Sequence, residues 1–179
     1  MPDVFDSLVR LIELQVSHNK FTGALPPSIA SSTRMEYLKL DYNEFSGTVP
    51  PDWFHGESKY KVLELDRNQL SGPLPTTIGY LTTLEDFRTA ENQMTGSLPS
   101  EIGNLSNLKI GFFPMNEFIG TVPSTWGGLT AMENLRLFET RLTGSIPSEL
   151  CALVDSQPKV LISADCKSEV TCDCCHKCY

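Results

Sequence analysis

The chain has 179 residues, with 14 lysines and arginines against 22 aspartates and glutamates, and its net charge is −8 at pH 7. This acidic balance argues against nucleic acid as a partner, because the phosphate backbone binds basic surfaces. The sequence contains no apolar run of about 18 residues, so we expect no membrane span in this chain. The length fits one elongated domain.

A regular repeat, with a period of about 24 residues, runs along most of the chain. An asparagine recurs at the same position of each period, and a threonine takes the last of these positions: Asn19, Asn43, Asn68, Asn92, Asn116 and Thr140. A glycine and then a proline follow each of these positions at fixed spacings, as Gly47 and Pro50 follow Asn43. A fixed period of this size is typical of a solenoid built from stacked units.

Residues 1–7 match only the end of one repeat. Pro2 and Phe5 lie one period before Pro26 and Ile29, so Met1 takes a position inside the pattern. No basic and apolar signal peptide precedes the repeats. We therefore expect that Met1 is not the native start and that upstream repeats and a signal peptide are missing. The full-length protein could then be membrane-anchored.

Residues 8–150 are expected to form the solenoid. In most copies two large apolar residues precede the asparagine by five and three positions, as Leu38 and Leu40 precede Asn43, which predicts a short strand with one buried face. Each asparagine amide is expected to bind backbone groups of its own repeat and the next, forming a buried ladder. The glycine and proline end the strand, and Ile102 and Leu105, three positions apart, indicate a helical turn on the convex side.

The repeat resembles the plant-type leucine-rich repeat, whose pattern L-x-x-L-x-L-x-x-N-x-[L/F]-[T/S]-G-x-[I/L/V]-P recurs in six copies and covers most of the chain. The resemblance implies an α/β solenoid, mostly strands and turns, wound as a right-handed superhelix. Local departures include Gly111 and Thr89, which replace core leucines.

Residues 151–179 are expected to form a cysteine-rich cap. The chain holds all its cysteines there: Cys151, Cys166, Cys172, Cys174, Cys175 and Cys178. Their even number and clustering favour disulfides formed in an oxidising compartment, although six cysteines allow 15 pairings. A zinc site that includes His176, and free thiols, are the alternatives. The end of the chain is similar to those of diatom leucine-rich-repeat proteins.

Outward-facing strand positions are the candidates for binding. Four positions before the ladder position stand Gln15, Lys39, Glu64, Arg88, Phe112 and Arg136; two before it stand Ser17, Asp41, Asp66, Ala90, Pro114 and Phe138; one before it stand His18, Tyr42, Arg67, Glu91, Met115 and Glu139. Aromatic residues, methionine and arginine gather in the last two repeats, as in binding hot spots. The selected candidates are Lys39, Tyr42, Arg67, Arg88, Phe112, Arg136 and Phe138. Alternatively, Phe112 or Phe138 turns inward beside Gly111 or lies under the tail.

No catalytic motif, phosphate loop or metal-binding motif occurs in the repeats, so we expect neither an enzyme nor a cofactor. The resemblance implies a recognition module of a receptor-like or secreted protein, extracellular or at the cell surface, that binds a protein, peptide or glycan. A secreted inhibitor of a hydrolase, similar to the polygalacturonase-inhibiting proteins, and a structural or adhesive wall protein are the alternatives. Asn104-Leu105-Ser106 is a glycosylation sequon.

Overall fold

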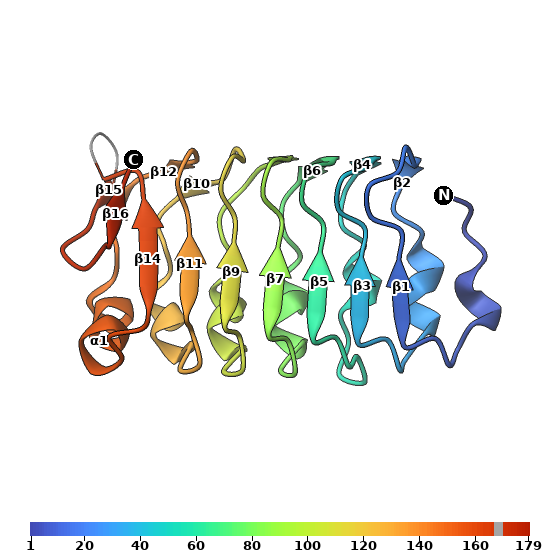
Figure 1. Ribbon diagram of the computed structural model, residues 1–179, viewed down its shortest axis with the longest axis horizontal. Coiled ribbons are helices and arrows are strands. Elements are labelled where there is room, and N and C mark those ends of the chain that lie inside the picture. Colours follow the sequence, from blue (N-terminus) through green and yellow to red (C-terminus); the bar gives the residue numbers. More distant parts are fainter. Residues whose placement is uncertain (167–169) are drawn as a thin grey trace.

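The computed structural model describes residues 1–166 and 170–179 as a row of stacked turns (Figure 1). One strand of each turn joins an eight-stranded parallel sheet in the order β1-β3-β5-β7-β9-β11-β14-β16. These strands are Glu13–Gln15, Tyr37–Lys39, Val62–Glu64, Asp86–Arg88, Ile110–Phe112, Asn134–Arg136, Leu161–Ala164 and Lys177–Cys178. The predicted solenoid is thus confirmed, and β16 adds a strand that the repeat pattern does not predict.

The second side of each turn carries short strands that the sequence pattern does not reveal. They form a four-stranded sheet, β2-β4-β6-β8, and two strand pairs, β10-β12 and β13-β15. Their bounds are Thr22–Ala24, Glu44–Gly47, Gln69–Gly72, Gln93–Met94, Ile119–Gly120, Arg141–Leu142, Gly144–Ser145 and Val170–Thr171. Glycines with positive φ recur along this side, such as Gly47 at 79°, where a side chain would be strained.

The third side is helical, as expected for the convex side. In the part of the chain that the structure describes, six 3-10 helices, η1 to η6, stack there and one α-helix, α1, follows. The bounds are Phe5–Ser7, Pro27–Ser31, Pro51–Trp53, Thr76–Tyr80, Ser100–Asn104, Ser124–Gly128 and, for α1, Ser148–Ser156. Glycine permits this close stacking: a β-carbon on Gly103 would lie 2.2 Å from the carbonyl oxygen of Thr125.

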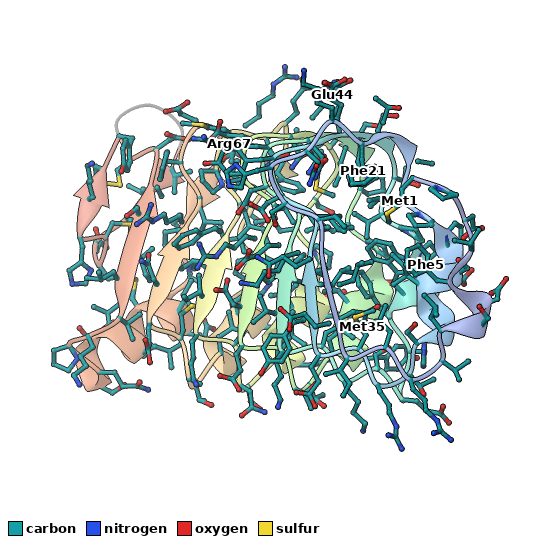
Figure 2. All side chains as sticks on the ribbon, turned by 45° about the vertical axis from the view of Figure 1, so that its right-hand side comes forward. Met1, Phe5, Phe21, Met35, Glu44 and Arg67 are labelled. Atoms are coloured by element: carbon teal, nitrogen blue, oxygen red, sulfur yellow. A yellow bond between two sulfur atoms is a disulfide. The ribbon has the colours of Figure 1, made fainter. Side chains whose placement is uncertain are left out.

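The apolar residues from all three sides meet in one core that runs along the stack. Leu38, Leu63, Phe87 and Leu135 point inward from the large sheet and are fully buried. Phe5, the residue that matches Ile29, is buried at the N-terminal end, which Figure 2 brings forward. Fully burying each such side chain contributes about 1.5–3 kcal/mol, so stacked neighbours stabilise one another.

Gly111 leaves space in this core that Phe113 fills. A β-carbon on Gly111 would lie 3.1 Å from the ring of Phe113, which is fully buried. The ring of Phe113 also packs against those of Phe87 and Trp126, with centroids 5.5 and 5.6 Å away. Phe112 therefore stays on the outer face of the sheet.

The asparagine ladder connects each repeat to the preceding one, rather than to the following one. The Asn68 amide donates hydrogen bonds to the carbonyl oxygens of Leu65 and Asp66 in its own repeat and of Leu40 in the preceding one, and its oxygen accepts from the Phe45 N–H. Asn43, Asn92 and Asn116 follow the same scheme. Asn19, at the end of the stack, is exposed.

Thr140 and Asp165 share the last step of the ladder. The Thr140 hydroxyl donates to the Leu137 carbonyl oxygen at 2.9 Å. The Asp165 carboxylate accepts from the N–H groups of Glu139 and Thr140 at 2.9 and 3.1 Å. One carboxylate thus satisfies the two backbone donors at this step.

Three disulfides hold the C-terminal cap: Cys151–Cys174, Cys166–Cys178 and Cys172–Cys175. Cys151 takes the repeat position of Gly79, Gly103 and Gly127, where a β-carbon would clash with the next helix. No further helix follows α1 in the described residues, so a side chain fits there and bonds to the tail.

Candidate functional site

The outward positions of the large sheet line up across the strands in one row. Parallel pairing joins Gln15, Lys39, Glu64, Arg88, Phe112 and Arg136, and continues through Ser163 to Lys177. Neighbouring strands lie about 4.8 Å apart, so these side chains are neighbours. We call this surface, which faces away from the helices, the concave face.

A depression of about 400 Å³ lies on the concave face. Residues from all three outward positions line it: Asp41, Tyr42, Glu64, Asp66, Arg67, Arg88, Ala90, Glu91, Phe112, Pro114, Met115, Arg136 and Phe138. Six of the seven candidate binding residues are among them. The seventh, Lys39, lies outside the lining and pairs with Glu64, with Nζ and Oε1 3.3 Å apart.

Phe112 lies at the centre of an arginine–aromatic stack. The guanidinium carbons of Arg136 and Arg88 lie 4.4 and 5.0 Å from the centre of its ring. A cation over the face of an aromatic ring is attracted by the ring electrons, by about 0.5–1 kcal/mol at exposed sites. The stack therefore presents a fixed apolar edge next to two positive charges.

The two arginines differ in their partners. Asp86 stands two positions before Arg88 on the same face of β7 and accepts two hydrogen bonds from it, each 2.8 Å long. This hydrogen bonding and the negative charge raise the pKa of Arg88. In the described residues, Arg136 makes no ion pair and is exposed. Arg136 is thus a cation that an anionic ligand group can reach.

Tyr42 and Arg67 form a second stack along the rim of the depression. The ring of Tyr42 lies 4.1 Å from that of His18, and the guanidinium carbon of Arg67 lies 4.5 Å from the Tyr42 ring. Arg67 also donates to Glu91 at 2.6 Å. These rim residues share left-handed backbone conformations, with φ between 52° and 57°. Their side chains are therefore held at the turn that ends each strand.

The depression has an acidic region around Asp66. The pKa of Asp66 is raised to about 7. Burial is the main cause and the nearby charges of Asp41 and Glu64 add to it, whereas the hydrogen bond from the Ala90 N–H and the charge of Arg88 act in the opposite direction. That hydrogen bond is 2.6 Å long. Asp41 is buried and accepts a hydrogen bond from the hydroxyl of Ser17. The site is thus acidic at one end and basic at the other.

Phe138 lies under the C-terminal tail, which is one of the two alternatives to an exposed binding position. Its side chain is only 8% exposed, and its ring stacks on that of Tyr179 with centroids 3.9 Å apart. Lys177 also lies over the ring of Tyr179, with Nζ 4.2 Å from the ring centre. Tyr179 and Lys177 therefore take the surface position that the sequence assigns to Phe138.

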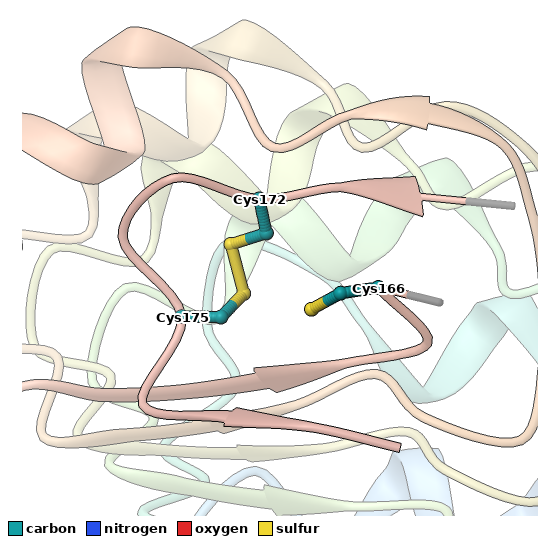
Figure 3. A group of neighbouring side chains, drawn as sticks. All are labelled: Cys166, Cys172 and Cys175. Carbon is teal, nitrogen blue, oxygen red and sulfur yellow. A yellow bond between two sulfur atoms is a disulfide. The ribbon is translucent and has the colours of Figure 1, made fainter. Parts of the chain in front are cut away.

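The cysteines near the end of the chain are the second candidate site, because the sequence left a zinc site open as an alternative to disulfides. The sulfur atoms of Cys166, Cys172 and Cys175 lie within 4.8 Å of one another (Figure 3). Each of the three belongs to a disulfide, which offers no thiolate. In this oxidised form the cluster therefore acts as a covalent clamp on the end of the chain.

Sequence reasoning missed four features of this site. Asp86 could have been found, because residues two apart on a strand share a face and Arg88 is its natural partner. The repeat pattern places Asp66 among the outward positions, but it does not reveal that the carboxyl group is largely buried there. Lys177 and Tyr179 lie beyond the repeats, and no repeat signal places them on the sheet.

Comparison with known proteins agrees with this geometry. The Leucine Rich Repeat family model matches residues 10–32. The fold is a leucine-rich-repeat solenoid. No curated protein has a sequence that matches the chain significantly. In the described residues, no helix is both long and apolar enough to cross a bilayer.

Several solved plant receptors have similar structures. One is the ectodomain of the Arabidopsis thaliana membrane receptor kinase GASSHO1/SCHENGEN3, solved with CASPARIAN STRIP INTEGRITY FACTOR 2. It is 28% identical in sequence to this chain and has a TM-score of 0.87, and the match covers 100% of this chain and 24% of that one. A TDR receptor is 27% identical, with a TM-score of 0.85 and coverage of 97% and 28%. The plant peptide hormone receptor RGFR1, solved with RGF2, is 25% identical, with a TM-score of 0.85 and coverage of 92% and 26%. This chain spans about a quarter of each.

Proposed function

We propose that this chain is an extracellular or cell-surface recognition module that binds a peptide or an extended protein segment in the depression of the concave face. The observation that carries the proposal is the stack of Phe112 with Arg88 and Arg136. Rigid aromatic and arginine groups in one hollow are typical of binding hot spots. An acidic or aromatic ligand side chain fits this end, and a basic one fits the end at Asp66.

The comparisons and the disulfides support this assignment. RGFR1 is a peptide hormone receptor, and the GASSHO1/SCHENGEN3 structure includes a bound factor. Three disulfides favour an oxidising compartment outside the cytosol. A discrete depression also favours a discrete ligand over a purely adhesive role in a wall. A hydrolase held at the same surface remains the alternative form of partner.

Selection from a random peptide library tests the proposal. The immobilised chain should enrich peptides with acidic or aromatic residues, and Arg136→Ala and Phe112→Ala should each weaken their binding about 30-fold or more, the loss expected when a central hot-spot residue is truncated. Tyr80→Ala, which removes an exposed aromatic ring from the helical side, is the matched control. Binding that depends on Tyr80 and not on Phe112 or Arg136 would contradict the proposal.

A further inference from the structure

The sequon on the helical side lies where the chain alternates between surface and core. Asn104 is the last residue of η5 and its side chain is exposed, as is that of Ser106. Leu105, between them, is fully buried. The folded chain thus fixes the sequon and turns only its asparagine and serine outward.

The repeat determines the neighbours of Asn104. Tyr80 occupies the equivalent position in the preceding repeat and Gly128 occupies it in the following one. The neighbour on one side is therefore an aromatic ring that is 59% exposed, and the neighbour on the other side has no side chain. Such a pair leaves open space next to a flat apolar surface.

A hollow of about 330 Å³ occupies this space, and Tyr80 and Asn104 both line it. A β-carbon on Gly79 would lie 3.2 Å from the Nδ2 atom of Asn104, so the amide points over the backbone next to Tyr80. Within residues 1–166 and 170–179, the Asn104 amide makes no hydrogen bond, whereas that of Asn107 donates to the Thr82 carbonyl oxygen at 2.8 Å. The Asn104 amide is thus free to carry a substituent.

The disulfides supply an independent argument about the compartment. All six cysteines are paired, which is the expected state in the secretory pathway, where asparagine glycosylation also takes place. A sequon alone is weak evidence, because such triplets occur by chance. Here the sequon, the exposed amide, the hollow and the disulfides agree.

We propose that Asn104 carries an N-linked glycan whose first N-acetylglucosamine lies in this hollow, with the C–H face of its ring against Tyr80. The donor is a lipid-linked oligosaccharide diphosphate. The Nδ2 atom of Asn104 forms a bond to the anomeric carbon, and the bond from that carbon to the diphosphate oxygen breaks. The lipid diphosphate leaves with the electron pair, and one amide proton is lost. The glycan covers the helical side and leaves the concave face open.

Mass spectrometry tests the site. The chain is secreted from eukaryotic cells behind a cleavable signal sequence, and its disulfides are verified. The peptide that contains Asn104 should carry a glycan that peptide N-glycosidase removes. Asn104→Gln and Ser106→Ala should abolish this mass, whereas Asn107→Gln, an exposed asparagine outside the sequon, should retain it. Recovery of the Asn104 peptide without a glycan from the disulfide-bonded secreted protein would overturn the proposal.

Thermal unfolding tests the sugar's position. After an endoglycosidase trims the glycan to a single N-acetylglucosamine, the protein should melt about 2–4 °C above the Asn104→Gln variant, the shift expected from a modest contact in a chain of this size. In the Tyr80→Ala background this gain should disappear, while Asn104 stays modified. Thr77→Ala, at the same hollow, should retain the gain. An equal gain with and without Tyr80, or no gain at all, refutes the contact with Tyr80.

Discussion

Asp66 offers the sharpest test of the electrostatics in the depression. Its carboxyl group is partly buried beside Asp41 and Glu64, and its pKa rises from 3.8 to about 7. The folded state therefore binds a proton on Asp66 more tightly than the unfolded state does. The charged form destabilises the folded chain above about pH 7, and this destabilisation is relieved as the pH falls from 7 towards 4.

The size of the effect follows from linkage. For a folded pKa of about 7 and an unfolded value of 3.8, the free energy of unfolding should be larger at pH 5 than at pH 8 by about 3 kcal/mol from this group alone. Asp66→Asn removes the titration and keeps an oxygen that can accept the hydrogen bond from the Ala90 N–H. The variant should lose this part of the pH dependence and gain stability at pH 8.

Urea unfolding of the wild type and of Asp66→Asn at pH 5 and pH 8 measures this difference. Asp52→Asn, which removes an exposed carboxylate from the helical side, is the matched control. If Asp66→Asn retains the full pH dependence of the wild type, Asp66 is not the buried acid that the structure describes. The reasoning about the acidic end of the depression would then fail.

Two further predictions concern the scaffold. Asn68→Ala leaves a buried N–H group and three carbonyl oxygens without the amide that binds them, so it should lower the free energy of unfolding by about 3 kcal/mol or more. Asn19→Ala, at the exposed end of the ladder, should lower it by less than about 1 kcal/mol in the same urea titration. Equal losses would contradict the ladder. Gly111→Ala should lower the free energy of unfolding by about 1–3 kcal/mol, because the added methyl group meets the ring of Phe113. Phe113→Leu in the same chain should recover part of this stability in thermal unfolding. If the two substitutions instead give additive losses, the packing of Phe113 against position 111 is refuted.

The repeat pattern predicted the repeated strands of the large sheet, their inward residues and the row of outward positions, because the same physical requirement recurs in every copy. Most strands of the large sheet turn an apolar side chain inward, as Leu38, Leu63 and Leu135 do, and the period places it in register with the next strand. Gly111 shows how local a departure can be. Phe113, the next inward position along the chain, fills the space, so the sheet continues without a break.

The cap could not be predicted in the same way. Whether Phe138 is exposed depends on where Tyr179 lies, and that depends on the Cys166–Cys178 disulfide. Nothing in the sequence chooses one of 15 cysteine pairings. The α-helix at Ser148–Ser156 takes the place of the short turns of the other repeats, and Cys151 stands in it where those turns have a glycine. Contacts that occur once in a chain carry no period to reveal them.

The pairing of charges on the concave face limits where binding energy can come from. Lys39 pairs with Glu64, Arg67 with Glu91 and Arg88 with Asp86, so a ligand that uses these groups must replace an existing contact. The Arg67–Glu91 pair is exposed, and exchanging such a pair gives a small net gain, about 0–1 kcal/mol. The other two pairs are half-buried, and each would also have to be broken before a ligand could use it. Arg136 and the ring edge of Phe112 have no such competitor in the described residues. Affinity should therefore depend mainly on these two side chains, and the paired charges should mainly select which ligands fit.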